Sequence, residues 1–160
     1  ERVKRAGTEN LLAIVGMGEA MEIAAANCAE NAARLTLLRD DLIRRLMAAI
    51  PDIRLNGHPI ERLPGNVNIS VRYIEGEALL LRLDLAGIAA SSGSACTSGS
   101  LDPSHVLLAI GLPHEIAHGS LRFSLSDNST QEDIDEVVRV LPGIVSTLRD
   151  MSPIFPRKEV

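Results

Sequence analysis

A cysteine at the centre of a ten-residue run of small residues is the most chemically suggestive feature of this sequence. The run, residues 91–100, reads SSGSACTSGS and surrounds Cys96 with side chains that carry neither charge nor bulk. Small residues and glycines leave the backbone conformationally free, so such a segment could present a thiol to a partner. The nucleophile would be the thiolate, and His105 is a candidate for helping the thiol lose its proton. An ordinary surface linker with an incidental cysteine is the alternative interpretation.

The second cysteine is interpreted differently. Cys28 lies among the alanines of residues 24–29 in a helical pattern, and free cysteine in such surroundings is typically a small buried hydrophobic residue. Two cysteines are too few for a disulfide scaffold, which favours a reducing compartment and a cytoplasmic location.

Four side chains are candidate metal ligands: Cys96, His105, His114 and His118. The last two stand four residues apart and could share a helical face. The eight-residue gaps that separate the others fit no compact ligand pattern, so no metal site is predicted. His58, in a Gly-His-Pro turn, is expected to face solvent.

Two helices are predicted to precede the first strand. The first begins near Thr8, whose hydroxyl could cap it, and runs to about Ala29. It is apolar nearly all round and is therefore expected to be deeply buried. The second covers about residues 31–49, where leucines recur at three- and four-residue steps, and Pro51 ends it.

The middle of the chain changes its periodicity. Residues 53–55 and 67–71 are predicted strands, and in the second of these apolar and polar residues alternate. Residues 75–85 are a predicted helix closed by Gly87, and residues 88–90 are a predicted strand that leads into the cysteine segment.

The last third repeats the alternation of helix and strand. Asp102 and Pro103 resemble a cap and first turn of a helix that runs through Ile110. Residues 121–125 are a predicted strand, and a stripe of apolar residues over 134–148 predicts a helix that Pro142 kinks or restarts. The whole pattern predicts an α/β fold with long helices packed on a small sheet.

Composition excludes several classes of function. The chain has 160 residues with 16 Lys and Arg against 21 Asp and Glu, and its net charge of −5 argues against nucleic-acid binding. Neither a signal peptide nor an apolar run of membrane-spanning length is recognised, because Glu19 and Glu22 interrupt the first apolar stretch. The chain begins with Glu1 rather than Met, which suggests a piece of a longer protein.

Four segments in this order resemble motifs of the group I (NifS/IscS-like) cysteine desulfurases, which are pyridoxal-phosphate enzymes of the class-V aminotransferase family. They are RAGTEN at 5–10, LPGNVN at 63–68, GSACTSGSLDPSHVL at 93–107 and HGSLRFSL at 118–125. The resemblance spans essentially the whole chain but only the C-terminal part of the family's length. It implies that residues 1–160 are the C-terminal small domain of a fold-type I transferase.

The resemblance also implies roles for three residues. Cys96 matches the nucleophile that takes sulfur from L-cysteine, leaving L-alanine and a persulfide for iron–sulfur cluster assembly. Arg122 matches the residue that binds the substrate carboxylate, a task that suits a bidentate guanidinium. Thr8 matches a residue that reaches the cofactor phosphate of the other protomer, which implies a homodimer. The further partner implied is an iron–sulfur scaffold or another sulfur acceptor.

The lysine that would hold pyridoxal phosphate is missing from the chain. Neither Lys4 nor Lys158 stands in the family's Ser-x-His-Lys setting, so that lysine is expected upstream of Glu1 and the isolated chain is expected to be inactive. The turn after the arginine strand also departs from the family, with Ser126 where glycine is usual. A selenocysteine lyase, another fold-type I enzyme and a non-catalytic sulfur-carrier module remain the alternatives.

Overall fold

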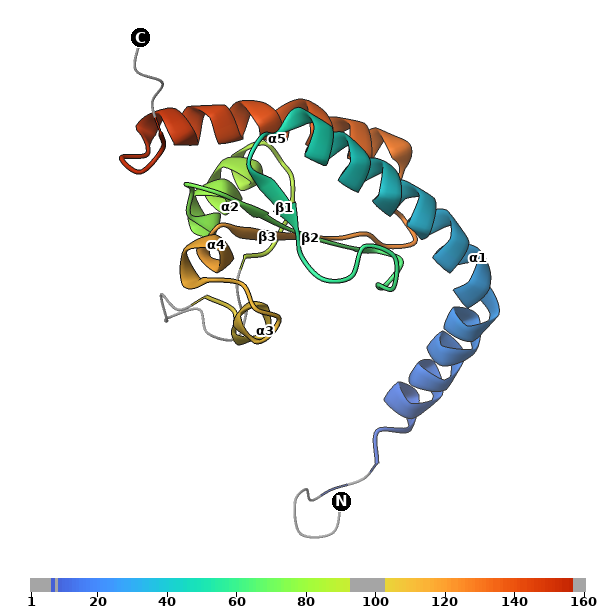
Figure 1. The fold of residues 1–160 in the computed structure, drawn as a ribbon. Coiled ribbons are helices and arrows are strands. Elements are labelled where there is room, and N and C mark those ends of the chain that lie inside the picture. The colour runs from blue at the N-terminus through green and yellow to red at the C-terminus, as the bar shows by residue number, and fades with distance from the viewer. Residues whose placement is uncertain (1–6, 8, 93–102, 157–160) are drawn as a thin grey trace.

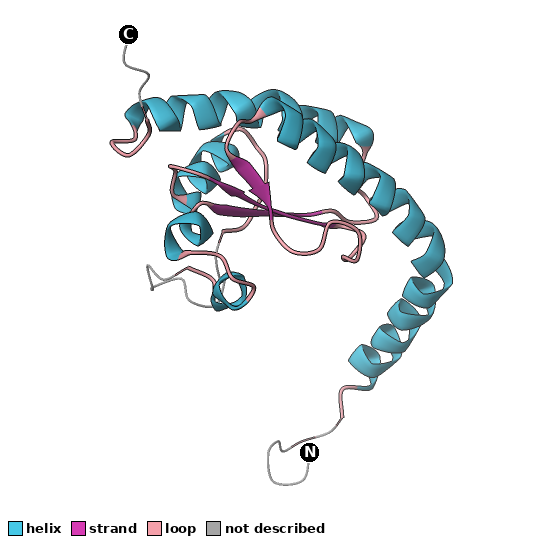
Figure 2. Ribbon diagram, in the orientation of Figure 1, coloured by secondary structure: helices cyan, strands magenta, loops and turns pink. Residues whose placement is uncertain are grey.

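A three-stranded antiparallel sheet, with two long helices across one face, is the centre of the computed structural model (Figures 1 and 2). The structure describes residues 7, 9–92 and 103–156. The strands, in spatial order, are β1 (Ile53–Leu55), β2 (Asn66–Val71) and β3 (Ser120–Ser124). The helices are α1 (Leu11–Ala49), α2 (Gly76–Leu85), α3 (His105–Ala109), α4 (His114–His118) and α5 (Gln131–Met151).

The sheet has one apolar and one polar face. Val67 and Ile69 of β2 and Leu121 and Phe123 of β3 are buried in a core that α1, α2 and α5 complete. Successive side chains on a strand point to opposite faces, so the residues between them, such as Asn68 and Arg122, face the other side. The predicted alternation is therefore confirmed, and the α/β architecture with long helices on a small sheet is confirmed with it.

Residues 11–49 form one helix rather than two. α1 is continuous from Leu11 to Ala49 because neither glycine nor proline interrupts the chain near Asn31, where a break was expected. Its N-cap is Asn10, whose side chain accepts a hydrogen bond from the backbone N–H of Ala13 at 3.1 Å. The cap expected at Thr8 is therefore wrong, and Thr8 itself lies outside the described residues.

The expected burial of the first half of α1 is also wrong. Every residue from Leu11 to Ala29 is exposed, and Figure 1 shows this half extending away from the sheet. Cys28 is consequently an exposed free cysteine and not a core residue. The sequence of an alanine-rich helix that is apolar nearly all round does not show which face packs against other elements. The prediction from hydropathy therefore overestimated how much of this helix is buried within this chain.

The same helix meets a length-and-composition criterion for crossing a membrane. An 18-residue window of α1 has a mean hydropathy of 1.4, and none of that window is buried. Core helices of globular proteins meet this criterion too, so it does not identify a span. The sequence-based expectation of no span rested on Glu19 and Glu22, both of which lie in the exposed half.

The second half of α1 packs against α5 and the sheet. Leu42 and Leu46 are fully buried there, as the leucine stripe predicted. α5 presents a matching stripe that includes Ile134, Leu141 and Val145. It begins with a capping box between Thr130 and Asp133 and, contrary to a predicted restart, continues through Pro142.

Two shorter elements differ from expectation. Residues 88–90 form no strand; the extended contact is a single bridge between Ser91 and Arg122. α3 begins after Ser104 rather than at Pro103, and Asp102 lies outside the described residues. The predicted end of α2 is confirmed by Gly87, whose φ of +76° favours glycine.

A charge cluster between α1 and α5 predicts how stability depends on pH. A hydrogen bond from Arg45 holds the pKa of Asp135 below its usual value. Burial raises the pKa of Asp41, but hydrogen bonds from Gln131 and the arginines outweigh it and the pKa lies below its usual value. Carboxylates with depressed pKa values stabilise the folded state above their unfolded pKa of about 4, and this contribution is lost as the pH falls through the folded values.

We therefore expect Asp135→Asn to flatten the acid limb of the stability profile. Urea midpoints measured from pH 7 to pH 2.5 should fall less steeply below pH ~4 in the variant than in the wild type. Glu132→Gln, which changes an exposed acidic residue in the first turn of the same helix, is the control. An unchanged acid limb in Asp135→Asn would show that the cluster contributes nothing to acid sensitivity.

The turn that leads into β3 depends on a glycine. A Cβ on Gly119 would lie 2.1 Å from the Val71 carbonyl oxygen and 2.8 Å from that of Ile74. We expect Gly119→Ala to destabilise the fold by about 2–3 kcal/mol, a cost within the range of overpacking. Gly143→Ala is the matched control, because nothing lies within 4 Å of its Cβ position and alanine favours helix interiors by about 1 kcal/mol. Denaturant unfolding of both variants distinguishes them, and equal stabilities would refute the close approach.

Candidate functional site

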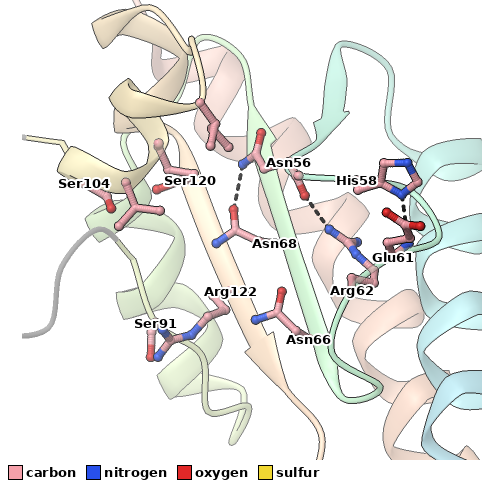
Figure 3. A pocket seen from close by; sticks show the side chains of 14 residues that line it. Asn56, His58, Glu61, Arg62, Asn66, Asn68, Ser91, Ser104, Ser120 and Arg122 are labelled. Carbon is pink, nitrogen blue, oxygen red and sulfur yellow. Dashed lines mark hydrogen bonds between the residues drawn. The ribbon is translucent and has the colours of Figure 1, made fainter.

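A cleft of about 400 Å³ lies on the polar face of the sheet (Figure 3). Its floor is formed by β2 and β3, one wall by the turn of residues 56–62, and another by α3. The lining side chains from α3 and its C-cap are apolar, namely Val106, Leu107 and Ile110. Those from the sheet and the turn are mostly polar and include Asn56, Arg62, Asn66, Asn68, Ser120 and Arg122. A ligand with one apolar and one charged end is the kind that such walls accommodate.

Arg122 projects from β3 into this cleft. Its neighbours Leu121 and Phe123 are buried on the core face, whereas Arg122 is exposed on the opposite face. The predicted orientation of this arginine is thereby confirmed. A guanidinium remains charged and can donate two parallel hydrogen bonds to a carboxylate, so the cleft can bind a carboxylate at this point.

Described residues on both sides of Cys96, namely Ser91 and Ser104, line the same cleft. Ser91 exchanges two backbone hydrogen bonds with Arg122, one of 3.0 Å from its N–H and one of 2.7 Å to its carbonyl oxygen. Ser104, which precedes α3, also lines the cleft. Cys96 itself falls within residues 93–102, outside the described residues. Ser91, before it, is bonded to Arg122, and Ser104, after it, lines the cleft that Arg122 also lines.

An amide network that the sequence interpretation missed supports the floor of the cleft. Asn56, only 2% exposed, donates from Nδ2 to Oδ1 of Asn68 at 2.7 Å and to Oγ of Ser70 at 2.9 Å. Asn68 lies directly opposite Arg122 in the ladder between β2 and β3. The alternation of polar residues in β2 could have pointed to Asn68, whereas the Asn56-Gly57 pair indicates only a turn.

A second guanidinium, Arg62, anchors the turn at the side of the cleft. It donates a hydrogen bond to the backbone oxygen of Asn56, and Arg39 of α1 in turn donates to the carbonyl of Leu63 at 3.3 Å. Burial lowers the pKa of Arg62, and repulsion from Arg39 lowers it further. Within the described residues, Nε and one terminal nitrogen of Arg62 lack a hydrogen-bond partner. This wall therefore carries positive charge that favours an anionic ligand.

Of the histidines among the described residues, His58 lines the cleft, whereas His105, His114 and His118 do not. His58 is exposed, as expected, and its Nδ1 accepts hydrogen bonds from the backbone N–H groups of Ile60 (3.2 Å) and Glu61 (2.8 Å). His114 and His118 share one turn of α4 with ring centroids 6.3 Å apart. Among the described residues no group of three His, Cys, Asp or Glu side chains is placed to hold a metal ion.

The described residues fit the substrate end of a pyridoxal-phosphate site and not its anchoring end. Both lysines of the sequence, Lys4 and Lys158, lie outside the described ranges, so no described amine can form the link to the cofactor. Thr8, the expected phosphate contact, is not described either. The cleft offers instead an arginine, Arg122, whose guanidinium can bind a carboxylate.

Comparison with known proteins identifies relatives of the chain. Residues 2–137 match the family described as Aminotransferase class-V. "Cysteine desulfurase IscS" of Methanosarcina thermophila is 56% identical over 99% of this chain, which covers 39% of that protein. A protein of the same name from Clostridium botulinum is 57% identical over 97% of the chain and 40% of its own length. The chain thus spans about two fifths of the length of the curated relatives it matches.

Solved structures show the same fold. The X-ray structure of a NifS-like protein from Rickettsia africae superimposes with a TM-score of 0.77 and 32% identity, covering 89% of this chain and 36% of that one. A second NifS-like protein gives the same TM-score and identity over 90% of this chain and 36% of its own. The expected resemblance to NifS/IscS-like proteins is therefore confirmed over nearly all of the chain.

Proposed function

The chain belongs to the class-V aminotransferase family, and from this premise we propose that it is the C-terminal part of a cysteine desulfurase. The whole protein would convert L-cysteine to L-alanine and hold the sulfur as a persulfide on Cys96. The observation that carries the proposal is the position of Arg122, in a cleft that is also lined by Ser91 and Ser104, the described residues on either side of the Cys96 region. This arrangement would bring a carboxylate-binding group and a thiol to one amino-acid substrate.

In the proposed reaction Arg122 binds the α-carboxylate of L-cysteine and fixes its orientation. Pyridoxal phosphate, held by the remainder of the protein, would act as the electron sink that weakens bonds next to the amino group. The Cys96 thiolate attacks the substrate sulfur, so an S–S bond forms while the Cβ–S bond breaks. The electron pair of the broken bond and a proton remain with the three-carbon fragment, which becomes L-alanine. Substrate and thiol thus give alanine and persulfide with no external oxidant.

The remaining parts of the proposal concern partners. Thr8 would contact the cofactor phosphate of a second protomer, which makes the working protein a homodimer with shared active sites. The persulfide would pass to a scaffold for iron–sulfur cluster assembly or to another sulfur acceptor, and a cytoplasmic location suits this role. Support for these assignments comes from the resemblance of residues 5–10 and 93–107 to cysteine desulfurase motifs.

Product analysis of the whole protein tests the proposed function. The full-length enzyme with pyridoxal phosphate and L-cysteine should form L-alanine and, in the presence of a thiol reductant, sulfide in equal amounts. Mass spectrometry after incubation without reductant should locate one additional sulfur on Cys96. A marked preference for L-selenocysteine, formation of a keto acid in place of alanine, or sulfur loading only from another protein would each support an alternative and reject the proposal.

A further inference from the structure

Asn68 lies where a second group could contact the carboxylate that Arg122 binds. The two residues are directly opposite each other on β2 and β3, and both line the cleft. Cβ atoms of directly opposed residues in an antiparallel pair are about 4.5–5.5 Å apart. A carboxylate has two oxygens with about four acceptor positions between them, so a guanidinium and an amide N–H can serve it together.

The orientation of the Asn68 amide follows from its buried neighbour. Both N–H groups of Asn56 Nδ2 are used, one by Asn68 Oδ1 and the other by Ser70 Oγ. Oδ1 of Asn56 is buried and has no hydrogen-bond partner among the described residues. If the Asn56 amide were rotated by 180°, its two N–H donors would occupy that position and would both be unpaired. One unpaired acceptor costs less than two unpaired donors. The Nδ2 group of Asn56 is therefore the donor in this contact, and Oδ1 of Asn68 is the acceptor.

Because the oxygen of Asn68 is held by Asn56, its nitrogen is directed elsewhere. Figure 3 shows the Asn68 nitrogen on the side of the amide away from Asn56. Within residues 9–92 and 103–156, neither N–H group of this nitrogen has a hydrogen-bond partner, so both can donate to an acceptor in the cleft. The neighbouring Asn66 lies on the same face of β2, but its partner in the ladder is Ser124 rather than Arg122.

We infer that Asn68 is a second substrate-binding residue, whose amide N–H donates to the carboxylate that Arg122 binds. Asn56 is then a positioning residue that fixes which end of Asn68 faces the substrate. This inference rests on the proposed function for the identity of the substrate, an α-amino acid. The same contact would make the cleft selective for amino acids over simple amines, because an amine without a carboxylate would leave the Asn68 donor unpaired.

Binding measurements on the whole enzyme test the inference. The ligands are L-alanine, the amino-acid product, and ethylamine, the same amine without the carboxylate. Asn68→Ala should bind L-alanine about tenfold more weakly than the wild type, the loss expected for a hydrogen bond to a charged group. Its affinity for ethylamine should not change. Asn128→Ala is the control, because Asn128 is an exposed asparagine in the turn after β3 that does not line the cleft. This variant should bind both ligands within about twofold of the wild type.

A second variant distinguishes a lost substrate contact from a folding defect. Asn68→Asp retains the oxygen that Asn56 requires and the size of the side chain, but it replaces the donor with negative charge. It should bind L-alanine more weakly than Asn68→Ala does, again with unchanged ethylamine binding and an unchanged Tm. Unaltered L-alanine binding in both variants, or an equal loss for both ligands, overturns the inference.

The test also separates the inference from the proposed function. Wild-type enzyme that releases sulfide from L-cysteine, combined with variants that bind L-alanine normally, rejects the role of Asn68 alone. Wild-type enzyme that forms no sulfide, combined with carboxylate-dependent losses in the variants, rejects the desulfurase assignment and supports the role of Asn68.

Discussion

Replacing Cys96 with serine in the whole enzyme is expected to abolish persulfide formation and to reduce sulfide release from L-cysteine by at least about 100-fold. A hydroxyl is a far weaker nucleophile than a thiolate at neutral pH, and it cannot form the S–S bond that the proposed reaction requires. Binding of L-alanine should remain close to that of the wild type, because Arg122 and the cleft are unchanged. Mass spectrometry and sulfide release under reducing conditions are the measurements.

The chain supplies its own matched control for this substitution. Cys28 is the other cysteine, and it is exposed on α1 and does not line the cleft. Cys28→Ser should therefore retain persulfide formation and sulfide release at wild-type rates. If Cys96→Ser desulfurates L-cysteine as fast as Cys28→Ser does, the assignment of the nucleophile is wrong.

Replacing Arg122 with alanine is expected to lower kcat/KM for L-cysteine on the order of 100-fold, mainly through a higher KM. A bidentate, charge-assisted contact with a carboxylate contributes about 3 kcal/mol, and 1.4 kcal/mol corresponds to a factor of ten. Arg122→Lys should recover part of the loss, since lysine retains the charge but not the two-pronged geometry. Steady-state kinetics with L-cysteine and with cysteamine, which has no carboxylate, distinguish charge recognition from structural damage.

The control for this prediction is Arg82→Ala. Arg82 is an exposed arginine in the last turn of α2 and does not line the cleft, so its removal should leave kcat/KM unchanged. An equal kinetic loss for cysteine and cysteamine in Arg122→Ala would indicate that the arginine supports the sheet rather than the substrate.

Local chemistry explains which parts of the fold could be predicted. Alternating residues in β2 and β3 identified both strands and the face of Arg122, because a period of two follows from strand geometry alone. The stripe on α5 and the glycine after α2 were equally informative. These features depend on neighbours in the sequence, so the sequence is sufficient to predict them.

The features that could not be predicted depend on distant contacts. Whether Cys28 is buried depends on what covers the first half of α1, and the apolar pattern of that half does not specify its partner. The cleft brings together Asn56, Asn68 and Arg122 from a turn and two strands. Asn56 acquires its role only through hydrogen bonds across the sheet, so its position in an Asn-Gly turn gave no indication of it.

The exposed half of α1 also has a consequence for local unfolding. Although α1 is one continuous helix of 39 residues, only the part near Leu42 and Leu46 shares in the core. Helices without tertiary packing are marginal in water at lengths of about 12–15 residues and fray from their ends. In the isolated chain, backbone amides of residues 14–28 should therefore exchange with solvent much faster than those of residues 40–48, so that a single helix contains two regions with different free energies of opening.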